Sequence, residues 1–312
     1  MKSGMKTGVK TRVQIRSGLE PWVYGALVLA VLQCGLFSVL KLRPGFVAIY
    51  LWIFGPVVIL LLAIGLLVVG LLSSGKRSSG NRPFWSRQRG AAFLLLITIV
   101  LISRIAYRVY PSSHDFEVSS VRFRLPLQGV VNVSMGGSTP DVNYHVGFPD
   151  QRWAYDLIVR HDGLRHSGQG SALDDYYVYN LPVIAPAWGI VISMVDGEPD
   201  KLIGARWSGT PAGNHIVLEV APNQYLFIGH LKPGSIRVKP GDAVQAGQEI
   251  GRVGNSGRTQ VPHVHIHLQD NASLGFGEGI PLYFYHYRSA GKIVDRGIPT
   301  GGDAEQVVEN IP

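Results

Sequence analysis

Three apolar segments in the first third of the chain limit what it can fold into. Residues 21–40 and 46–72 contain no charged residue, and each reaches the roughly 20 residues needed to cross the hydrocarbon core of a bilayer. The third segment, about residues 91–109, is interrupted by Arg104. An arginine near the end of a membrane helix can extend its long side chain to the lipid headgroups. We therefore predict a membrane region over residues 21–110, with three transmembrane helices at about 21–40, 46–72 and 91–109.

Positive charge is concentrated in two segments beside these apolar runs. The leader, residues 1–20, and the loop 76–89 each contain five lysines and arginines. Because basic loops stay on the cytoplasmic side, both should be cytoplasmic, and three spans then place everything after Tyr110 outside the cytoplasm. We expect a multi-pass protein of the bacterial inner membrane with a periplasmic C-terminal domain, and we allow for a membrane-protein partner. This placement of charge also explains the net charge of +8, so nucleic acid is not an expected partner.

The sequence changes character after Ser112. Short runs of alternating apolar residues follow, separated by turn pairs such as Asp196-Gly197 and Pro240-Gly241, and no stretch has a helical period. This pattern is typical of a mainly antiparallel β domain. The predicted fold class is therefore a multidomain chain in which three N-terminal transmembrane α-helices precede a mainly antiparallel β domain. We place the β domain at residues 115–288 and expect a loosely held polar tail at residues 289–312.

Three histidines spaced two apart form the most distinctive motif. His263, His265 and His267 alternate with valine, isoleucine and leucine. In a strand, the three imidazoles would project from one face and the apolar residues from the other. Neutral imidazole is the commonest metal ligand, so this strand is a candidate for a metal site. A surface strand with accidental histidines is the alternative.

Asp156 is a second candidate ligand because it lies in the middle of the apolar run WAYDLIV. A buried carboxylate needs a partner, which could be a metal, a salt bridge or a hydrogen-bond donor. The only cysteine, Cys34, lies in an apolar run, and the sequence has no HExxH motif. A cysteine-based zinc site and a zinc site on an HExxH helix are therefore excluded.

Several ordered motifs carry a resemblance to a known family. The segments LPVIAPAWG, GNHIVLEV, GHLKPGSIRVKPGDAVQAGQEIG and GNSGRTQVPHVHIHL resemble the lysostaphin-like zinc metallopeptidases, which are cell-wall endopeptidases with a small β fold. The likeness covers roughly Leu125 to Asp270, about half of the chain. It implies that His265 and Asp156 bind Zn²⁺ and that His230 and His263 assist catalysis.

The chain departs from the family at the first ligand. The family places a histidine four residues before the aspartate, and Arg152 occupies that position. Arginine has no lone pair to donate, so it cannot bind zinc. His145, eleven residues before Asp156 in NYHVGFPDQRWAYD, is similar to an Asn-x-His variant of the motif, and we nominate it as the third metal ligand. His161 and His166 are weaker rivals.

Four further residues are weaker candidates. His267 stands where the family often has an acidic residue, and it could orient a ligand by hydrogen bonding. Tyr176 and Tyr177 lie in the loop 162–180, where they could form the wall of a substrate groove or be structural. Asn214 is a candidate for either of these supporting roles.

The resemblance implies a membrane-anchored zinc endopeptidase that hydrolyses peptide bonds in peptidoglycan cross-links or stem peptides. The main alternative is an inert module of the same fold that scaffolds or activates another cell-wall hydrolase, and Arg152 is its best support. Retention of Asp156, His230, His263 and His265 together favours the enzyme. A phosphoryl-carrier domain of similar β architecture does not explain an extracytoplasmic location.

Overall fold

The computed structural model describes residues 19–42, 46–75, 87–106, 108–205 and 209–311. The chain divides into two units, one of residues 1–35 with 57–103, the other of residues 36–56 with 104–312. Each is described by itself. The leader and most of the basic loop, on which the predicted orientation depends, lie outside the described residues.

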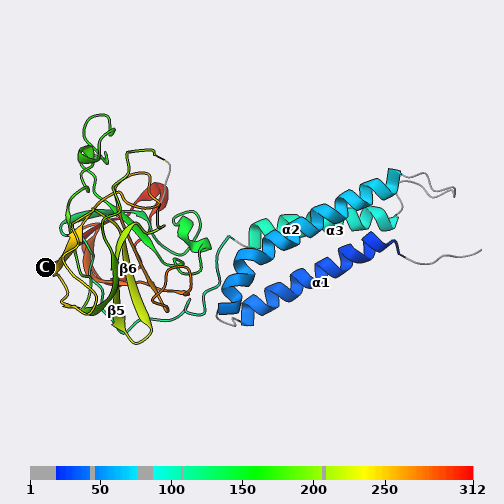
Figure 1. Cartoon of the computed structure of the whole chain (residues 1–312), viewed down its shortest axis with the longest axis horizontal. Helices are drawn as coiled ribbons and strands as arrows, with labels where there is room; N and C mark the ends of the chain where they lie inside the picture. Colours follow the sequence, from blue (N-terminus) through cyan, green and yellow to red (C-terminus); the bar gives the residue numbers. More distant parts are fainter. Residues whose placement is uncertain (1–18, 43–45, 76–86, 107, 206–208, 312) are drawn as a thin grey trace, which may run out of the picture. The chain divides into compact units, whose positions relative to one another are not determined.

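The N-terminal third forms three helices: α1 (Pro21–Leu42), α2 (Phe46–Gly75) and α3 (Arg87–Ala106). Figure 1 shows them in blue to cyan. Two stretches, Pro21–Leu40 and Val47–Ser73, are long and apolar enough to cross a membrane, with mean hydropathies of 2.1 and 2.9. The helix α3, which begins with arginine, is not among them. Two of the three predicted spans are therefore supported.

Polar contacts join α1 and α3 within the first unit. The side chains of Gln33 and Ser103 hydrogen-bond to each other at 3.0 Å while buried, and Arg89 forms an ion pair with Glu20 at 2.8 Å. Hydrogen bonds between helices satisfy polar groups that a lipid environment would leave unpaired.

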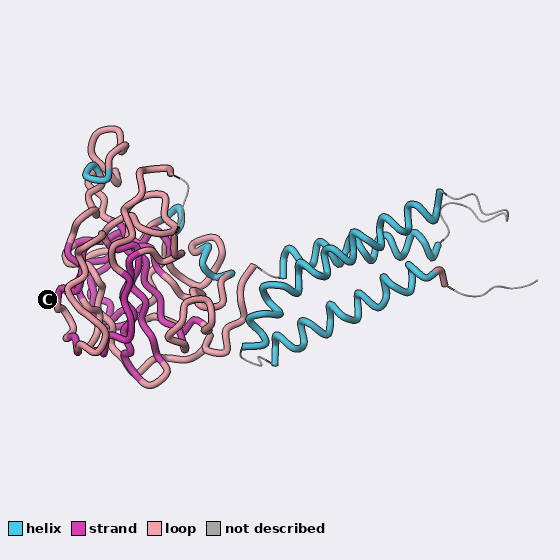
Figure 2. Tube along the Cα trace, in the orientation of Figure 1, coloured by secondary structure: helices cyan, strands magenta, loops and turns pink. Residues whose placement is uncertain are grey.

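The second unit contains a mainly antiparallel β domain, as predicted (Figures 1 and 2). Its large sheet runs in the order β12-β11-β13-β1-β2-β9-β6-β5-β4-β7, with β10 beside β9, and β3 and β8 form a separate pair. In chain order the strands are β1 (Val130–Met135), β2 (Tyr155–Ile158), β3 (Pro182–Ile184), β4 (Gly189–Val195), β5 (Asn214–Ala221), β6 (Gln224–Leu231), β7 (Ala243–Val244), β8 (Glu249–Arg252), β9 (Val264–Gln269), β10 (Gly279–Ile280), β11 (Phe284–Ser289), β12 (Lys292–Gly297) and β13 (Val307–Asn310).

The histidine strand β9 lies in the middle of this sheet, between β2 and β6. Its apolar residues Val264, Ile266 and Leu268 are fully buried in the main core. His265 and His267 lie on the opposite face and are also buried. Both faces of β9 are thus covered, one by apolar side chains and the other by the polar groups described below.

The C-terminal residues differ from the expected loosely held tail. Residues 289–312 contain β12 and β13, and β13 pairs with both β1 and β11. Val308 is fully buried and lies opposite Val131 of β1. The segment is polar because most of its side chains face solvent, while its backbone completes one edge region of the sheet.

Candidate metal centre

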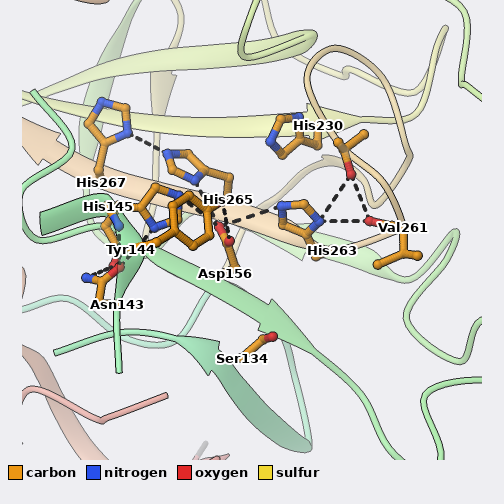
Figure 3. Close-up of polar contacts among 12 residues, drawn as sticks. Ser134, Asn143, Tyr144, His145, Asp156, His230, Val261, His263, His265 and His267 are labelled. Atoms are coloured by element: carbon orange, nitrogen blue, oxygen red, sulfur yellow. Dashed lines mark hydrogen bonds and ion pairs between the residues drawn. The ribbon is translucent and has the colours of Figure 1, made fainter. Parts of the chain in front are cut away.

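Strand register brings Asp156 and His265 together. The two residues are direct partners across the antiparallel β2–β9 pair, and Nδ1 of His265 lies 3.0 Å from Oδ1 of Asp156. On its other side His265 faces Gly229 of β6, so no side chain from that neighbour covers its ring. Figure 3 shows the arrangement of the two side chains.

His145 completes a group of three donors. It lies on the single-turn 3₁₀ helix Tyr144–Gly147, and its Nε2 is 3.6 Å from Oδ1 of Asp156. One donor atom each from His145, Asp156 and His265 lie within 4.8 Å of one another, and all three residues are buried. The rivals His161 and His166 are not in this group; their rings pack against Tyr177 and Tyr176 instead.

Asn143 determines which nitrogen of His145 faces the group. The amide nitrogen of Asn143 donates to the carbonyls of Gly137 and Ala154, so its Oδ1 must face His145. That oxygen accepts from Nδ1 of His145 at 3.0 Å. Since Nδ1 carries the proton, Nε2 presents its lone pair toward Asp156.

His230 and His263 lie beside the three donors, and backbone carbonyls fix both rings. Nδ1 of His263 donates to the carbonyl of Val261 and Nδ1 of His230 to the carbonyl of Ser256, each at 2.8 Å. Each ring therefore keeps its lone pair on Nε2, and Nε2 of His263 lies 3.6 Å from Oδ1 of Asp156. The two ring centroids are 4.7 Å apart.

The backbone around His230 is held by close contacts. His230 has a φ of 61°, a left-handed conformation that non-glycine residues seldom adopt and that is concentrated at functional sites. Its carbonyl partner at Ser256 is held by a contact between Gly213 and Gly257: a Cβ on Gly257 would lie 2.2 Å from the nitrogen of Gly213. A side chain at either glycine would push these loops apart.

The protonation states suit a cation. Burial lowers the pKa of His145 to about 3 and also lowers the pKa of His230, which keeps both rings neutral. The hydroxyl of Tyr144 donates to Oδ2 of Asp156, and a hydrogen bond donated to a carboxylate favours its ionised form. Neutral imidazole and ionised carboxylate are the forms that bind metals.

The donor set therefore fits a divalent metal. Lone pairs of His145 and His263 converge on a buried carboxylate oxygen, and neither ring nitrogen carries a proton to share with it. The two lone pairs and the carboxylate oxygen repel one another, and a cation bound between them would remove this repulsion. Two histidines and one carboxylate are also an established donor set for catalytic zinc.

Residues of the donor group line two cavities. One of about 190 Å³ is lined by His145, His230 and His265. A wider one of about 810 Å³ is lined by Asp156 and His263. Tyr144 and Arg258 line both, and the hydroxyl of Tyr144 donates to Oδ2 of Asp156 at 3.2 Å.

Arg152, at the position of the usual first ligand, serves a different purpose. It is buried, its Nε donates to the carbonyl of Tyr110 at 3.0 Å, and its guanidinium stacks on Trp153. A carboxylate oxygen of Asp115 lies 3.5 Å away. Arg152 thus fastens the segment that precedes the β domain.

The weaker candidates have mixed outcomes. His267 hydrogen-bonds Nε2 of His265 at 2.9 Å, which fits a supporting role. Tyr176 and Tyr177 line neither cavity, and Tyr176 is buried with its hydroxyl on the carbonyl of Gly170. Asn214 is fully buried, bonds backbone groups of Glu198 and Leu231, and lines neither cavity.

Three polar residues at the site were missed in the sequence. Asn143 could have been found from its place in the Asn-x-His motif, because a donor or acceptor two residues from a ligand often orients it. Gln269 continues the alternation of His265 and His267 along β9. Tyr144 carries no signal beyond being next to His145.

Comparison with known proteins identifies the domain. Residues 171–274 match Peptidase family M23. This span includes His230, His263 and His265, and it begins after His145 and Asp156. The chain is also similar to the catalytic domain of the M23 protein EnpA from Enterococcus faecalis, with 24% identity over 50% of this chain and 93% of that one, and a TM-score of 0.34.

Two further structures are similar to this chain. The catalytic domain of lysostaphin from Staphylococcus simulans is 20% identical over 48% of this chain and 86% of its own, with a TM-score of 0.29. A zinc-containing peptidase from Vibrio cholerae is 20% identical over 51% of this chain and 39% of its own, with a TM-score of 0.30. The match of residues 171–274 to Peptidase family M23 supports the resemblance drawn from the motifs and assigns that part of the chain to the family.

Proposed function

We propose that this protein is a membrane-anchored zinc metallo-endopeptidase that hydrolyses peptide bonds of peptidoglycan. The observation that carries the proposal is the convergence of His145, Asp156 and His265 on one point, with His230 and His263 beside them. His145, Asp156 and His265 would hold the metal. Zinc bound there supplies Lewis acidity, which activates water and polarises a carbonyl near neutral pH.

His230 and His263 supply proton transfer in this proposal. Each has its Nδ1–H bonded to a carbonyl and its Nε2 lone pair available. One ring can accept a proton from the attacking water at Nε2. The other can stabilise developing negative charge or return a proton to the leaving amine. Hydrogen bonds to fixed carbonyls keep both rings oriented throughout.

We favour the enzyme over the inert-module alternative. That alternative rested on Arg152 at the usual ligand position, yet His145 lies close enough to supply the third donor. Arg152 has its own partner at the carbonyl of Tyr110, so its presence need not mark a decayed site.

The membrane topology is part of the proposal. We take α3 as a third span, supported by the buried hydrogen bond of Ser103 with Gln33 of the first span and by the ion pair of Arg89 with Glu20, the residue before α1. Three spans place the β domain across the membrane from the leader, toward the cell wall, whereas two spans would leave it in the cytoplasm. A reporter fused after Ser113 should be active only outside the cytoplasm, and cytoplasmic activity would contradict this topology.

Zinc content and hydrolysis of purified cell wall, measured on the full chain in detergent, test the enzymatic proposal. The parent protein should hold one zinc ion per chain and release peptides with new amino termini. His230→Gln should retain zinc and lose hydrolysis, while His286→Gln, at an exposed position on β11, should retain both. A zinc-loaded parent that cleaves no peptidoglycan peptide would favour the inert module, and a parent without zinc affinity would refute the metal site.

A further inference from the structure

Three side chains on one face of β9 are bonded in series behind the metal centre. Nε2 of His265 lies 2.9 Å from Nδ1 of His267, and Nε2 of His267 lies 3.2 Å from Oε1 of Gln269. The three residues are 6%, 1% and 0% exposed. Figure 3 shows the first of these bonds, which points away from Asp156. The series leads from the donor group to the loop after β9.

At the outer end of the series, the direction of hydrogen-bond donation is fixed. The amide nitrogen of Gln269 donates to the carbonyl of Asn271 and, at 3.0 Å, to the carbonyl of Ser273. Carbonyl oxygens only accept, so a flipped amide would set its oxygen against two other oxygens. The orientation is therefore settled by chemistry, and Oε1 of Gln269 faces His267 as an acceptor. Nε2 of His267 must carry a proton to satisfy it.

The protonation of His267 determines which nitrogen of His265 donates. Its ring stacks on Phe227 with centroids 4.8 Å apart and planes 7° apart. Among the described residues its hydrogen-bond partners are the imidazole of His265 and the amide of Gln269. A charged ring in such a place would be buried without a counter-ion, which is costly. The neutral ring with its proton on Nε2 has a lone pair on Nδ1, and this nitrogen must accept from His265.

His265 is thereby left in one tautomer. Its Nε2 carries the proton that is donated to His267, so Nδ1 carries the lone pair, and Nδ1 is the nitrogen that faces Asp156 at 3.0 Å. We propose that Gln269 and His267 are positioning residues that fix Nδ1 of His265 as its metal-binding nitrogen. This inference rests on the proposed metal site. Without the series, His265 could hold its proton on Nδ1 and donate it to Asp156. Neither Nδ1 of His265 nor Oδ1 of Asp156 would then be available to a metal.

The zinc dissociation constant of the full chain, measured by competition with a chelator, tests the inference. His267→Leu removes the acceptor for His265 and should weaken zinc binding about 10–100-fold, the usual effect of losing a hydrogen bond that supports a metal ligand. His267→Gln offers an oxygen that accepts from His265 and an amide that donates to Gln269, so it should recover most of the affinity. His215→Leu is the matched control, because its ring also packs near Phe227 but bonds none of the three residues.

The outcomes separate this inference from the proposed function. A parent protein that binds no zinc refutes the metal site itself. A parent that binds zinc, with His267→Leu equally tight or His267→Gln as weak as His267→Leu, refutes the positioning role alone. Gln269→Met tests the same series one residue further out and should also weaken binding, so the inference remains testable if His267→Leu does not fold. Unchanged zinc affinity in a folded Gln269→Met protein would show that Gln269 does not fix the tautomers of His267 and His265.

Discussion

Nδ1 of His265 lies 3.0 Å from Oδ1 of Asp156, although 109 residues separate the two in the sequence. Their strands are direct neighbours, and the pair is aligned residue for residue. The sheet register therefore positions the carboxylate beside the imidazole. Both side chains of this half of the site lie on strands, not on loops. The consequences for metal binding can be tested residue by residue.

Replacing Asp156 with asparagine should remove most zinc from the protein. The amide has nearly the shape of the carboxylate but lacks its charge, and its nitrogen would face imidazole lone pairs. Zinc retained after dialysis is the measurement. Asp150→Asn is the control, since Asp150 is equally buried and accepts from the backbone of Gly275 instead. Full zinc retention in Asp156→Asn would contradict its role as a ligand.

Two substitutions at Asn143 should separate metal affinity from stability. Asn143→Leu removes the acceptor of His145 and should weaken zinc binding about 10–100-fold. Asn143→Asp keeps an acceptor for His145 but loses both donors to the carbonyls of Gly137 and Ala154. It should therefore stay close to the parent in zinc affinity while losing about 1–3 kcal/mol of stability. Equal zinc affinity in Asn143→Leu and the parent would show that the tautomer of His145 does not depend on Asn143.

Restoring the usual family histidine should not restore the site. The side chain at position 152 leads toward Tyr110 and Asp115, and its Cβ packs against Gly279. In a His145→Ala background, Arg152→His should therefore fail to recover zinc. The single change Arg152→His should also cost about 0.5–1.5 kcal/mol, because the carbonyl of Tyr110 loses one of its donors and keeps the amide of Ser112. Recovery of zinc by the double variant would mean that position 152 can still reach Asp156.

The histidine strand and the burial of Asp156 could both be predicted from the sequence. The alternation of His265 and His267 with apolar residues predicts a strand with two different faces, because strand geometry has a fixed period of two. The burial of Asp156 follows in the same way from its apolar neighbours. Both inferences depend only on local sequence.

Non-local features were harder to predict. His145 reaches Asp156 through a 3₁₀ turn held by Asn143, a geometry that no periodicity in the sequence reports. The polarity set by Gln269 depends on two carbonyls in the following loop. The pairing of Val308 with Val131 is equally invisible locally, since a short polar strand acquires its stability from a partner far away in the chain. That is why residues 289–312 were expected to be a loose tail.

The segment before the β domain is joined to it by a charged cluster, and this cluster should make stability depend on pH. His114 bonds Asp270 through Nε2 at 3.2 Å and Glu117 through Nδ1. Glu278 lies beside them, with its carboxylate accepting from Tyr110 and Ser113. The hydrogen bond that His114 donates to Asp270 raises the pKa of His114 to about 9, against the opposing effect of burial and with a further contribution from Glu117.

The direction of the pH effect follows from this shift. The pKa of His114 is about 9 in the folded protein and about 6.5 in the unfolded chain, so the folded state binds the proton more tightly. The stabilisation is fully present below about pH 6.5 and is lost as the pH rises through about 9. Melting temperatures of the β domain between pH 6 and 10 should therefore fall more steeply for the parent than for His114→Gln. His286→Gln, at an exposed position on β11, should keep the parent's slope. If His114→Gln follows the parent across this range, the imidazole is not charged in the folded protein.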